Sequence, residues 1–257
     1  MLNAFLMILS TSYFAWYFQT HETTAVYPFD ASYTSPTVAG EARLSERRIT
    51  TEDDESLIIW RAEPAPGKPT IVYFCGNAGG LKDRAERFAQ LIDAGYGVIA
   101  PAYRGSSGST GKPSEMALLD DATRLVQAET IPLILYGESL GTAVAIRLAA
   151  NGFGDAVVLE APFTSINDLV AQQYPTEDLS SLITQKWESA THAPDLSQPL
   201  LVIHGSDDNT VPITMGRKIF DAAGSSDKAF LEIAKGGHSG LWTPDARATL
   251  FAFFDRS

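Results

Sequence analysis

Residues 132–141 read PLILYGESLG, and this stretch decides the fold. The apolar run PLILY has the length of a buried strand, GESLG at 137–141 fits the pattern G-x-S-x-G, and a helix-length pattern follows over Leu140–Ala150. A serine on such a sharp strand-to-helix turn sits in strained backbone, so its near neighbours must be glycine. Its hydroxyl is exposed at the edge of the sheet. The stretch therefore predicts that Ser139 is a nucleophile.

Apolar runs of strand length alternate with helix-length patterns on both sides of this stretch. Strands are expected at Thr70–Cys75, Gly97–Tyr103, Pro132–Tyr136, Ala156–Ala161, Leu200–His204 and Ala229–Ala234. Helices are expected near Leu81–Ala94, Ser114–Ala128, Leu140–Ala150, Ile213–Ala223 and Pro244–Phe254. This alternation predicts an α/β fold with a mostly parallel central sheet and helices on both faces. The site of such a sheet lies at the carboxyl ends of the strands.

The composition limits the class of protein. The chain has 257 residues, 45% of them hydrophobic and 19% charged, which suits one globular domain and excludes a disordered chain. Its net charge of -12 argues against a nucleic-acid partner. Cys75 is the only cysteine, so an intrachain disulfide is excluded, and a buried apolar role is favoured over a second nucleophile. No metal or cofactor is predicted, because HExxH and paired CxxC motifs are absent.

The first residues form an uncharged and mostly apolar segment. Residues 2–18 carry no charged side chain, and about 17 residues is the lower limit for a membrane-spanning helix. A membrane anchor is therefore expected over residues 1–18. A cleaved signal peptide of a secreted or periplasmic protein fits less well, because no early Lys or Arg and no small-x-small cleavage site is present. The other alternative is a packed or interfacial helix, in a cytoplasmic protein. Residues 19–47 are expected to form a linker and the first edge elements, and residues 48–257 the catalytic domain.

A serine hydroxyl needs a positioned base, and His238 is the favoured candidate. It lies in KGGHSG (235–240), a glycine-rich loop after an expected strand and before the last helix, where an imidazole can reach across. The other histidines are less suited. His21 lies in the linker, His192 in a polar stretch and His204 at the end of a strand.

The acid that orients the imidazole should lie between the serine and the histidine in the chain. The segment HGSDDNTVP (204–212) follows a buried strand and offers Asp207 and Asp208. Asp208 is favoured, and Asp207 is the alternative or a turn-capping residue. Glu160, at the end of the preceding strand, is a third candidate.

Two backbone amides are candidates for stabilising an oxyanion. One is the amide of Leu140, at the start of the helix that follows the serine. The second should come from the loop after an early strand, which reads CGNAGG at 75–80, and the Asn77 amide is favoured. The loop lacks the G-x-x-x-x-G-K-[ST] pattern, so a P-loop is discounted.

Six motifs in this order resemble the α/β-hydrolase superfamily. They are GNAGG (76–80), YRGSSGSTGKPSE (103–115), GESLG (137–141), APFTS (161–165), HGSDDNTVP (204–212) and GGHSG (236–240). More narrowly, the chain is similar to the branch of membrane-anchored serine hydrolases that includes protein depalmitoylases. The branch usually has histidine where this chain has Cys75 and aspartate where it has Ala102, and neither position is given a catalytic role.

The resemblance implies a role for each matching residue. Ser139 is the nucleophile and His238 the base, and the acid is the fifth residue of the H-G-x-x-D stretch, which is Asp208. The backbone amides of Asn77 and Leu140 form the oxyanion hole. A short lid is expected over residues 162–198.

The expected activity is that of a serine hydrolase, of the esterase and thioesterase class EC 3.1. The triad would cleave a carboxylic ester or thioester through an acyl-enzyme, acting on small acyl esters or on an acylated protein at a membrane. The alternatives are a peptidase or an acyltransferase with the same triad, and a catalytically silent, membrane-tethered scaffold.

Overall fold

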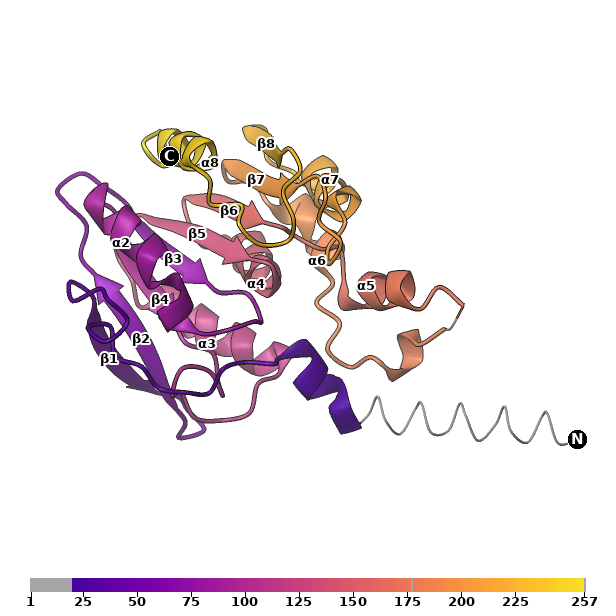
Figure 1. Ribbon diagram of the computed structural model, residues 1–257, viewed down its shortest axis with the longest axis horizontal. Coiled ribbons are helices and arrows are strands. Elements are labelled where there is room, and N and C mark those ends of the chain that lie inside the picture. The colour runs from indigo at the N-terminus through magenta and orange to yellow at the C-terminus, as the bar shows by residue number, and fades with distance from the viewer. Residues whose placement is uncertain (1–19, 177, 257) are drawn as a thin grey trace, which may run out of the picture.

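The computed structural model describes residues 20–176 and 178–256, with an eight-stranded sheet at the centre (Figure 1). The strands are β1 (Ser45–Thr50), β2 (Ser56–Ala62), β3 (Thr70–Phe74), β4 (Gly97–Pro101), β5 (Leu133–Glu138), β6 (Ala156–Glu160), β7 (Leu200–Gly205) and β8 (Lys228–Ile233). Their spatial order is β1-β2-β4-β3-β5-β6-β7-β8. Pairing is antiparallel from β1 to β2 and from β2 to β4, and parallel across the rest. The predicted α/β class with a mostly parallel sheet is confirmed.

Helices cover both faces of the sheet (Figure 1). They are α2 (Ala85–Asp93), α3 (Glu115–Gln127), α4 (Leu140–Ala150), α5 (Ile166–Gln173), α6 (Ser189–His192), α7 (Ile213–Ala222) and α8 (Pro244–Phe254). On one face α4 contacts β5 and β6 and packs against α3 and α6. It is apolar almost all round, as a helix enclosed on every side must be. On the other face Trp242, just before α8, donates a hydrogen bond of 2.7 Å to Gln90 of α2.

The strands that carry the centre of the sheet are fully buried. Every residue of β3, β4, β6 and β7 is buried, which explains the continuous apolar runs in the sequence. The edge strand β1 is instead exposed or half-buried along its length, and it pairs with β2 from Ser45–Arg61 to Thr50–Ser56. Because the parallel strands run the same way, the loops after β3, β5, β7 and β8 gather at one end of the sheet.

Residues 20–47 pack against this core. Residues 20–26 are helical, and Val26, Tyr27 and Leu44 are buried in the main core cluster. The expected anchor at residues 2–18 lies outside the described residues. Within residues 20–176 and 178–256 no helix is both long and apolar enough to cross a bilayer.

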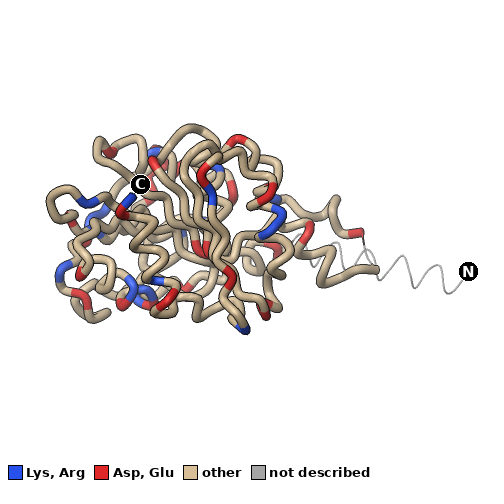
Figure 2. Tube along the Cα trace, turned by 90° about the horizontal axis from the view of Figure 1, so that it is seen from above, with Lys and Arg blue, Asp and Glu red and all other residues tan. Residues whose placement is uncertain are grey.

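The segment between β6 and β7 forms a small cap over the carboxyl ends of the strands. It contains α5 and α6 and two short 3-10 turns, Ser180–Leu182 and Ala193–Asp195. Lys and Arg are interspersed with Asp and Glu along the described chain (Figure 2).

Candidate active site

Ser139 sits on the sharp turn that its sequence predicts. It follows β5 directly and precedes α4, with φ 50° and ψ -113°. Its amide donates to the carbonyl of Glu160 at 2.8 Å. Only glycine fits on either side, because a Cβ at Gly137 would lie 2.4 Å from the Gly141 carbonyl, and one at Gly141 would lie 2.0 Å from the Phe74 carbonyl. The strained turn is thus fixed by close backbone packing.

The three side chains predicted as a catalytic set lie in one hydrogen-bonded chain. His238 Nε2 is 3.0 Å from Ser139 Oγ, and His238 Nδ1 is 2.8 Å from Asp208 Oδ2. Three different loops, after β5, β7 and β8, bring them together at the carboxyl ends of the strands. The His238 side chain is 24% exposed, whereas that of Asp208 is fully buried. The imidazole is therefore partly open to solvent, whereas the carboxylate that binds it is not.

The Asp208 carboxylate is held by the loop that follows β7. Its Oδ1 accepts hydrogen bonds from the amides of Thr210 at 2.9 Å and Val211 at 2.8 Å. Burial raises the pKa of Asp208, but contacts with His204 and His238 and the Val211 amide outweigh burial, so the pKa lies well below its usual range. Asp208 thus stays ionised at neutral and mildly acidic pH and can stabilise a positive charge on His238.

The alternative candidates have other partners. Asp207 is exposed, and its carboxylate accepts a hydrogen bond from Ser206 at 3.0 Å. Glu160 is buried and bound to Arg87 at 2.8 and 3.0 Å. His204 is buried with its Nε2 at 2.8 Å from the Val211 carbonyl. The geometry therefore favours Asp208 as the partner of His238.

The loop after β3 lies against Ser139. A Cβ at Gly76 would be 3.4 Å from the Ser139 Cβ, and Asn77 faces the same cavity as the serine. The Asn77 and Leu140 amides find no hydrogen-bond acceptor among the described residues, so both are free to donate. The Asn77 side chain is occupied, because its Nδ2 donates to the Val26 carbonyl at 3.1 Å.

A cavity of about 580 Å³ opens beside Ser139 and His238, within the range of small-molecule sites of ~300–1,000 Å³. The cap supplies a group of apolar lining side chains, Phe163, Ile166, Leu169, Val170 and Ile183, and the loop after β7 adds Val211. Helical residues 20–26 form a further wall, with His21, Glu22, Ala25 and Val26 among the lining residues. This wall is not predicted from the sequence, in which residues 19–47 read as a linker and edge elements.

Glu22 ties that helical wall to the cap. Its carboxylate is buried and accepts hydrogen bonds from the amides of Thr184 at 2.6 Å and Gln185 at 2.9 Å and from the Thr184 hydroxyl at 2.5 Å. Tyr27 adds a second tie, since its hydroxyl donates to Gln185 at 2.8 Å and accepts from the Trp187 indole at 3.0 Å. The cavity is closed on this side by polar contacts between segments far apart in the chain.

Replacement of Glu22 by alanine is expected to destabilise the protein. The Thr184 and Gln185 amides would lose a charged acceptor, which is worth about 1.5–3 kcal/mol. Urea unfolding measures the free energy of unfolding, and Thr24→Ala, an exposed change on the same helical turn, is the control. Equal stability of the two variants would contradict the assigned role of Glu22.

Comparison with known proteins shows where this geometry belongs. A family model described as "Alpha/beta hydrolase family" matches residues 71–189. An uncharacterized protein of Mycobacterium tuberculosis is 33% identical over 213 residues, which cover 79% of this chain and 75% of the relative. The chain belongs to the α/β-hydrolase family.

Further relatives of this α/β hydrolase carry names. The lysophosphatidylserine lipase ABHD12 of Danio rerio is 35% identical over 183 residues, which cover 62% of this chain and 48% of the lipase. The hydrolase thus spans about half the length of that relative. The solved esterase Pf2001 of Pyrococcus furiosus has a TM-score of 0.73 at 17% identity, covering 90% of this chain and 96% of the esterase, and shares the fold. The chain is therefore a hydrolase of a family that contains lipases and esterases.

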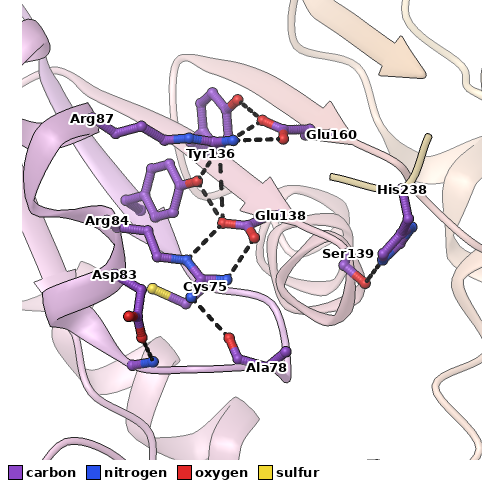
Figure 3. A network of polar contacts seen from close by, with 12 residues as sticks. Cys75, Ala78, Asp83, Arg84, Arg87, Tyr136, Glu138, Ser139, Glu160 and His238 are labelled. Atoms are coloured by element: carbon purple, nitrogen blue, oxygen red, sulfur yellow. Dashed lines mark hydrogen bonds and ion pairs between the residues drawn. The ribbon is translucent and has the colours of Figure 1, made fainter. Parts of the chain in front are cut away.

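A buried network of ion pairs lies next to the serine of this α/β hydrolase (Figure 3). Arg84 binds Glu138, with Nη2 at 2.6 Å from Oε1, and Arg87 binds Glu160. The Tyr73 hydroxyl donates to Glu138 at 2.7 Å. Burial raises the pKa of Glu138, but Arg84 and Arg87 outweigh burial and the pKa is lowered. The two arginines therefore keep Glu138 ionised behind the nucleophile.

Cys75 and Ala102, which differ from the residues usual in the similar branch, have structural roles in this hydrolase. Cys75 is buried, and burial raises the pKa of its thiol to about 12, so the thiol stays protonated at neutral pH. Its carbonyl accepts a hydrogen bond from the Tyr103 hydroxyl at 3.0 Å. Ala102 is buried, and its amide donates to the Ile58 carbonyl at 2.8 Å.

In residues 20–176 and 178–256 no cluster of three His, Cys, Asp or Glu side chains could hold a metal ion.

Proposed function

We propose that this protein is a serine hydrolase that cleaves carboxylic esters or thioesters through an acyl-enzyme. One observation carries the proposal: the hydrogen-bonded chain Asp208–His238–Ser139 ends at an apolar cavity. A serine in contact with an imidazole that is itself oriented by a carboxylate is the arrangement that activates a hydroxyl.

Each group then has a defined task. His238 takes the Ser139 proton while Oγ attacks the carbonyl carbon, and Asp208 stabilises the imidazolium that forms. The amides of Asn77 and Leu140 hold the negative charge on the substrate oxygen. His238 passes the proton to the leaving alcohol or thiol. A water molecule, deprotonated by His238, then attacks the acyl-enzyme, and the acid is released.

The cavity supports an acyl group as part of the substrate. Its lining of apolar side chains favours an acyl chain, and its position beside Ser139 allows the chain to enter while the carbonyl reaches Oγ. The lipase names among the relatives support an acyl ester as the substrate. Small acyl esters and an acylated protein both fit this description, whereas nothing in the described residues favours a peptide bond.

Membrane association through residues 2–18 belongs to the same proposal. The segment would keep the protein at a bilayer, where acylated substrates are concentrated. Because residues 20–26 line the cavity and Leu44 is in the core, we place residues 20–47 with the catalytic unit. Release of the full-length protein from membranes by an alkaline carbonate wash would refute the spanning anchor.

The experiment that tests the hydrolase is fluorophosphonate labelling together with hydrolysis of p-nitrophenyl esters of increasing chain length. In labelling, Ser139 Oγ displaces fluoride and forms a stable phosphonyl ester, which peptide mass spectrometry locates. We expect label on Ser139 and turnover of the esters. A folded protein that neither takes up label nor hydrolyses any ester would instead be a silent scaffold.

A larger side chain in the cavity is expected to shorten the preferred acyl chain. Leu169 of α5 lines the cavity, so Leu169→Trp removes room for methylene groups, each worth about 1–3 kcal/mol of transition-state binding. The ratio of kcat/KM for p-nitrophenyl laurate to that for the butyrate should fall about tenfold or more. Gln172→Trp, on the exposed face of the same helix, is the control. An unchanged ratio in Leu169→Trp would show that the acyl chain lies elsewhere.

A further inference from the structure

Arg84 touches two separate parts of the candidate site (Figure 3). Its Nε and Nη2 bind the Glu138 carboxylate at 3.1 and 2.6 Å, and its Nη1 donates to the Ala78 carbonyl at 2.8 Å. Glu138 directly precedes Ser139, and Ala78 directly follows Asn77. One guanidinium thus joins the strand that carries the nucleophile to the loop that carries the first amide donor.

The loop at residues 76–80 needs such support because three of its five residues are glycine. Gly79 adopts φ 72°, a conformation that glycine reaches without strain. Other contacts hold the loop from the N-terminal side, where the Asp30 amide donates to the Gly79 carbonyl at 3.2 Å and the Val26 carbonyl accepts from the Asn77 side chain at 3.1 Å. Of the hydrogen bonds to this loop from described side chains, that of Arg84 is the one that also reaches β5.

The side chain is well placed to hold a fixed distance. It is 12% exposed, and the planar guanidinium makes two parallel hydrogen bonds to Glu138, which fix its orientation. The remaining nitrogen, Nη1, is thereby held in a fixed position from which it donates to the Ala78 carbonyl. The distance between the loop and the nucleophile turn is therefore set by one planar group.

We propose that Arg84 is a positioning residue for the oxyanion hole: it fixes the Asn77 amide relative to Ser139 and the Leu140 amide. This inference rests on the proposed hydrolase function. The amides act on charge that develops in the transition state, so a displaced loop raises the barrier more than it weakens ground-state binding in a cavity that is lined mainly by other residues.

The test compares Arg84→Met with Arg87→Met. Both variants delete one guanidinium of the same buried cluster and leave one glutamate without its main partner, so both lose stability. Arg87 donates to Tyr73 and Glu160, and its nearest oxygen on Glu138 is 3.8 Å away, but it does not contact the loop. Arg87→Met is therefore a matched control for the stability that is lost when one guanidinium of the cluster is removed.

With p-nitrophenyl butyrate, Arg84→Met should lower kcat by about 10- to 100-fold with KM little changed, since a misplacement of about 1 Å can cost that much. Arg87→Met should keep kcat near that of the wild type. A trifluoromethyl ketone, whose adduct with the serine carries an oxyanion, should lose affinity for Arg84→Met in parallel with kcat. It should bind Arg87→Met as it binds the wild type.

If Arg84→Met does not fold, Arg84→Lys replaces it. Lysine keeps the positive charge beside Glu138, but its single ammonium group does not reproduce the fork that also reaches Ala78. We expect a kcat clearly below that of the wild type, with KM little changed. Equal losses of kcat in the Arg84 and Arg87 variants, or a change confined to KM, would overturn the inference. Absence of label on Ser139 in the wild type would refute the hydrolase proposal itself, which separates the two failures.

Discussion

Replacement of Ser139 by alanine is expected to abolish ester hydrolysis, with a loss in kcat of about 10⁴- to 10⁶-fold. The variant keeps the amides of Asn77 and Leu140 and the cavity, but it has no Oγ to form the acyl-enzyme. The residual rate would come from the oxyanion hole and binding alone. Fluorophosphonate labelling should disappear together with turnover.

Ser239 provides the control for this prediction. It follows His238 directly in the chain, is exposed, and lines the same small pocket as Ser139 and His238. Ser239→Ala should keep label and turnover, and circular dichroism should show that both variants are folded. Labelling that persists in Ser139→Ala would contradict the assignment of the nucleophile.

Replacement of Asp208 by asparagine should lower kcat by about 10³- to 10⁴-fold. In the wild type, Oδ1 accepts hydrogen bonds from the amides of Thr210 and Val211, while Oδ2 faces His238 Nδ1. The amide oxygen of asparagine must stay with the two backbone donors, so its NH₂ group takes the place of Oδ2. It then donates to Nδ1 and fixes the proton of His238 on Nε2. The imidazole cannot accept a proton from Ser139 in that tautomer.

The variant Asp207→Asn tests the alternative that Asp207, rather than Asp208, is the acid of the triad. Asp207 is exposed and bound to Ser206, so this variant should keep kcat close to that of the wild type. The pair of variants is read from kcat for a p-nitrophenyl ester at saturating concentration. A large loss in Asp207→Asn with little loss in Asp208→Asn would reverse the choice of the acid.

Much of the fold could be predicted because the strands at its centre are buried on both faces. The apolar runs that form β3, β5, β6 and β7 are continuous, and the predicted bounds agree with the observed ones within two residues. The strand β2 is not among the strands expected from the sequence. Its residues SLIIWRA form a short apolar run, and periodicity cannot distinguish such a run from other buried segments. Ser139 was predictable from the glycines that its turn requires.

The rest of the site depends on contacts between distant residues. Arg84 meets Glu138 across 54 positions, and Glu22 meets Thr184 across 162. No local pattern signals either pair. The segment HETTAV at 21–26 reads as polar chain, and it is helical next to a cap whose amides its glutamate binds. The sequence therefore predicts the reacting groups, but it does not predict the side chains that hold them in place.

The helical wall at residues 20–26 decides where the protein can be shortened. An investigator who removes the apolar N-terminal segment to obtain material for crystallisation would naturally cut at β1, where the sheet begins. A cut there also discards Glu22, Val26 and Asp30, which hold the cap and the loop after β3. The shortened protein would keep its sheet and its serine but would have an open cavity and a loosened loop. The useful cleavage point therefore lies before Thr20, close to the end of the apolar segment.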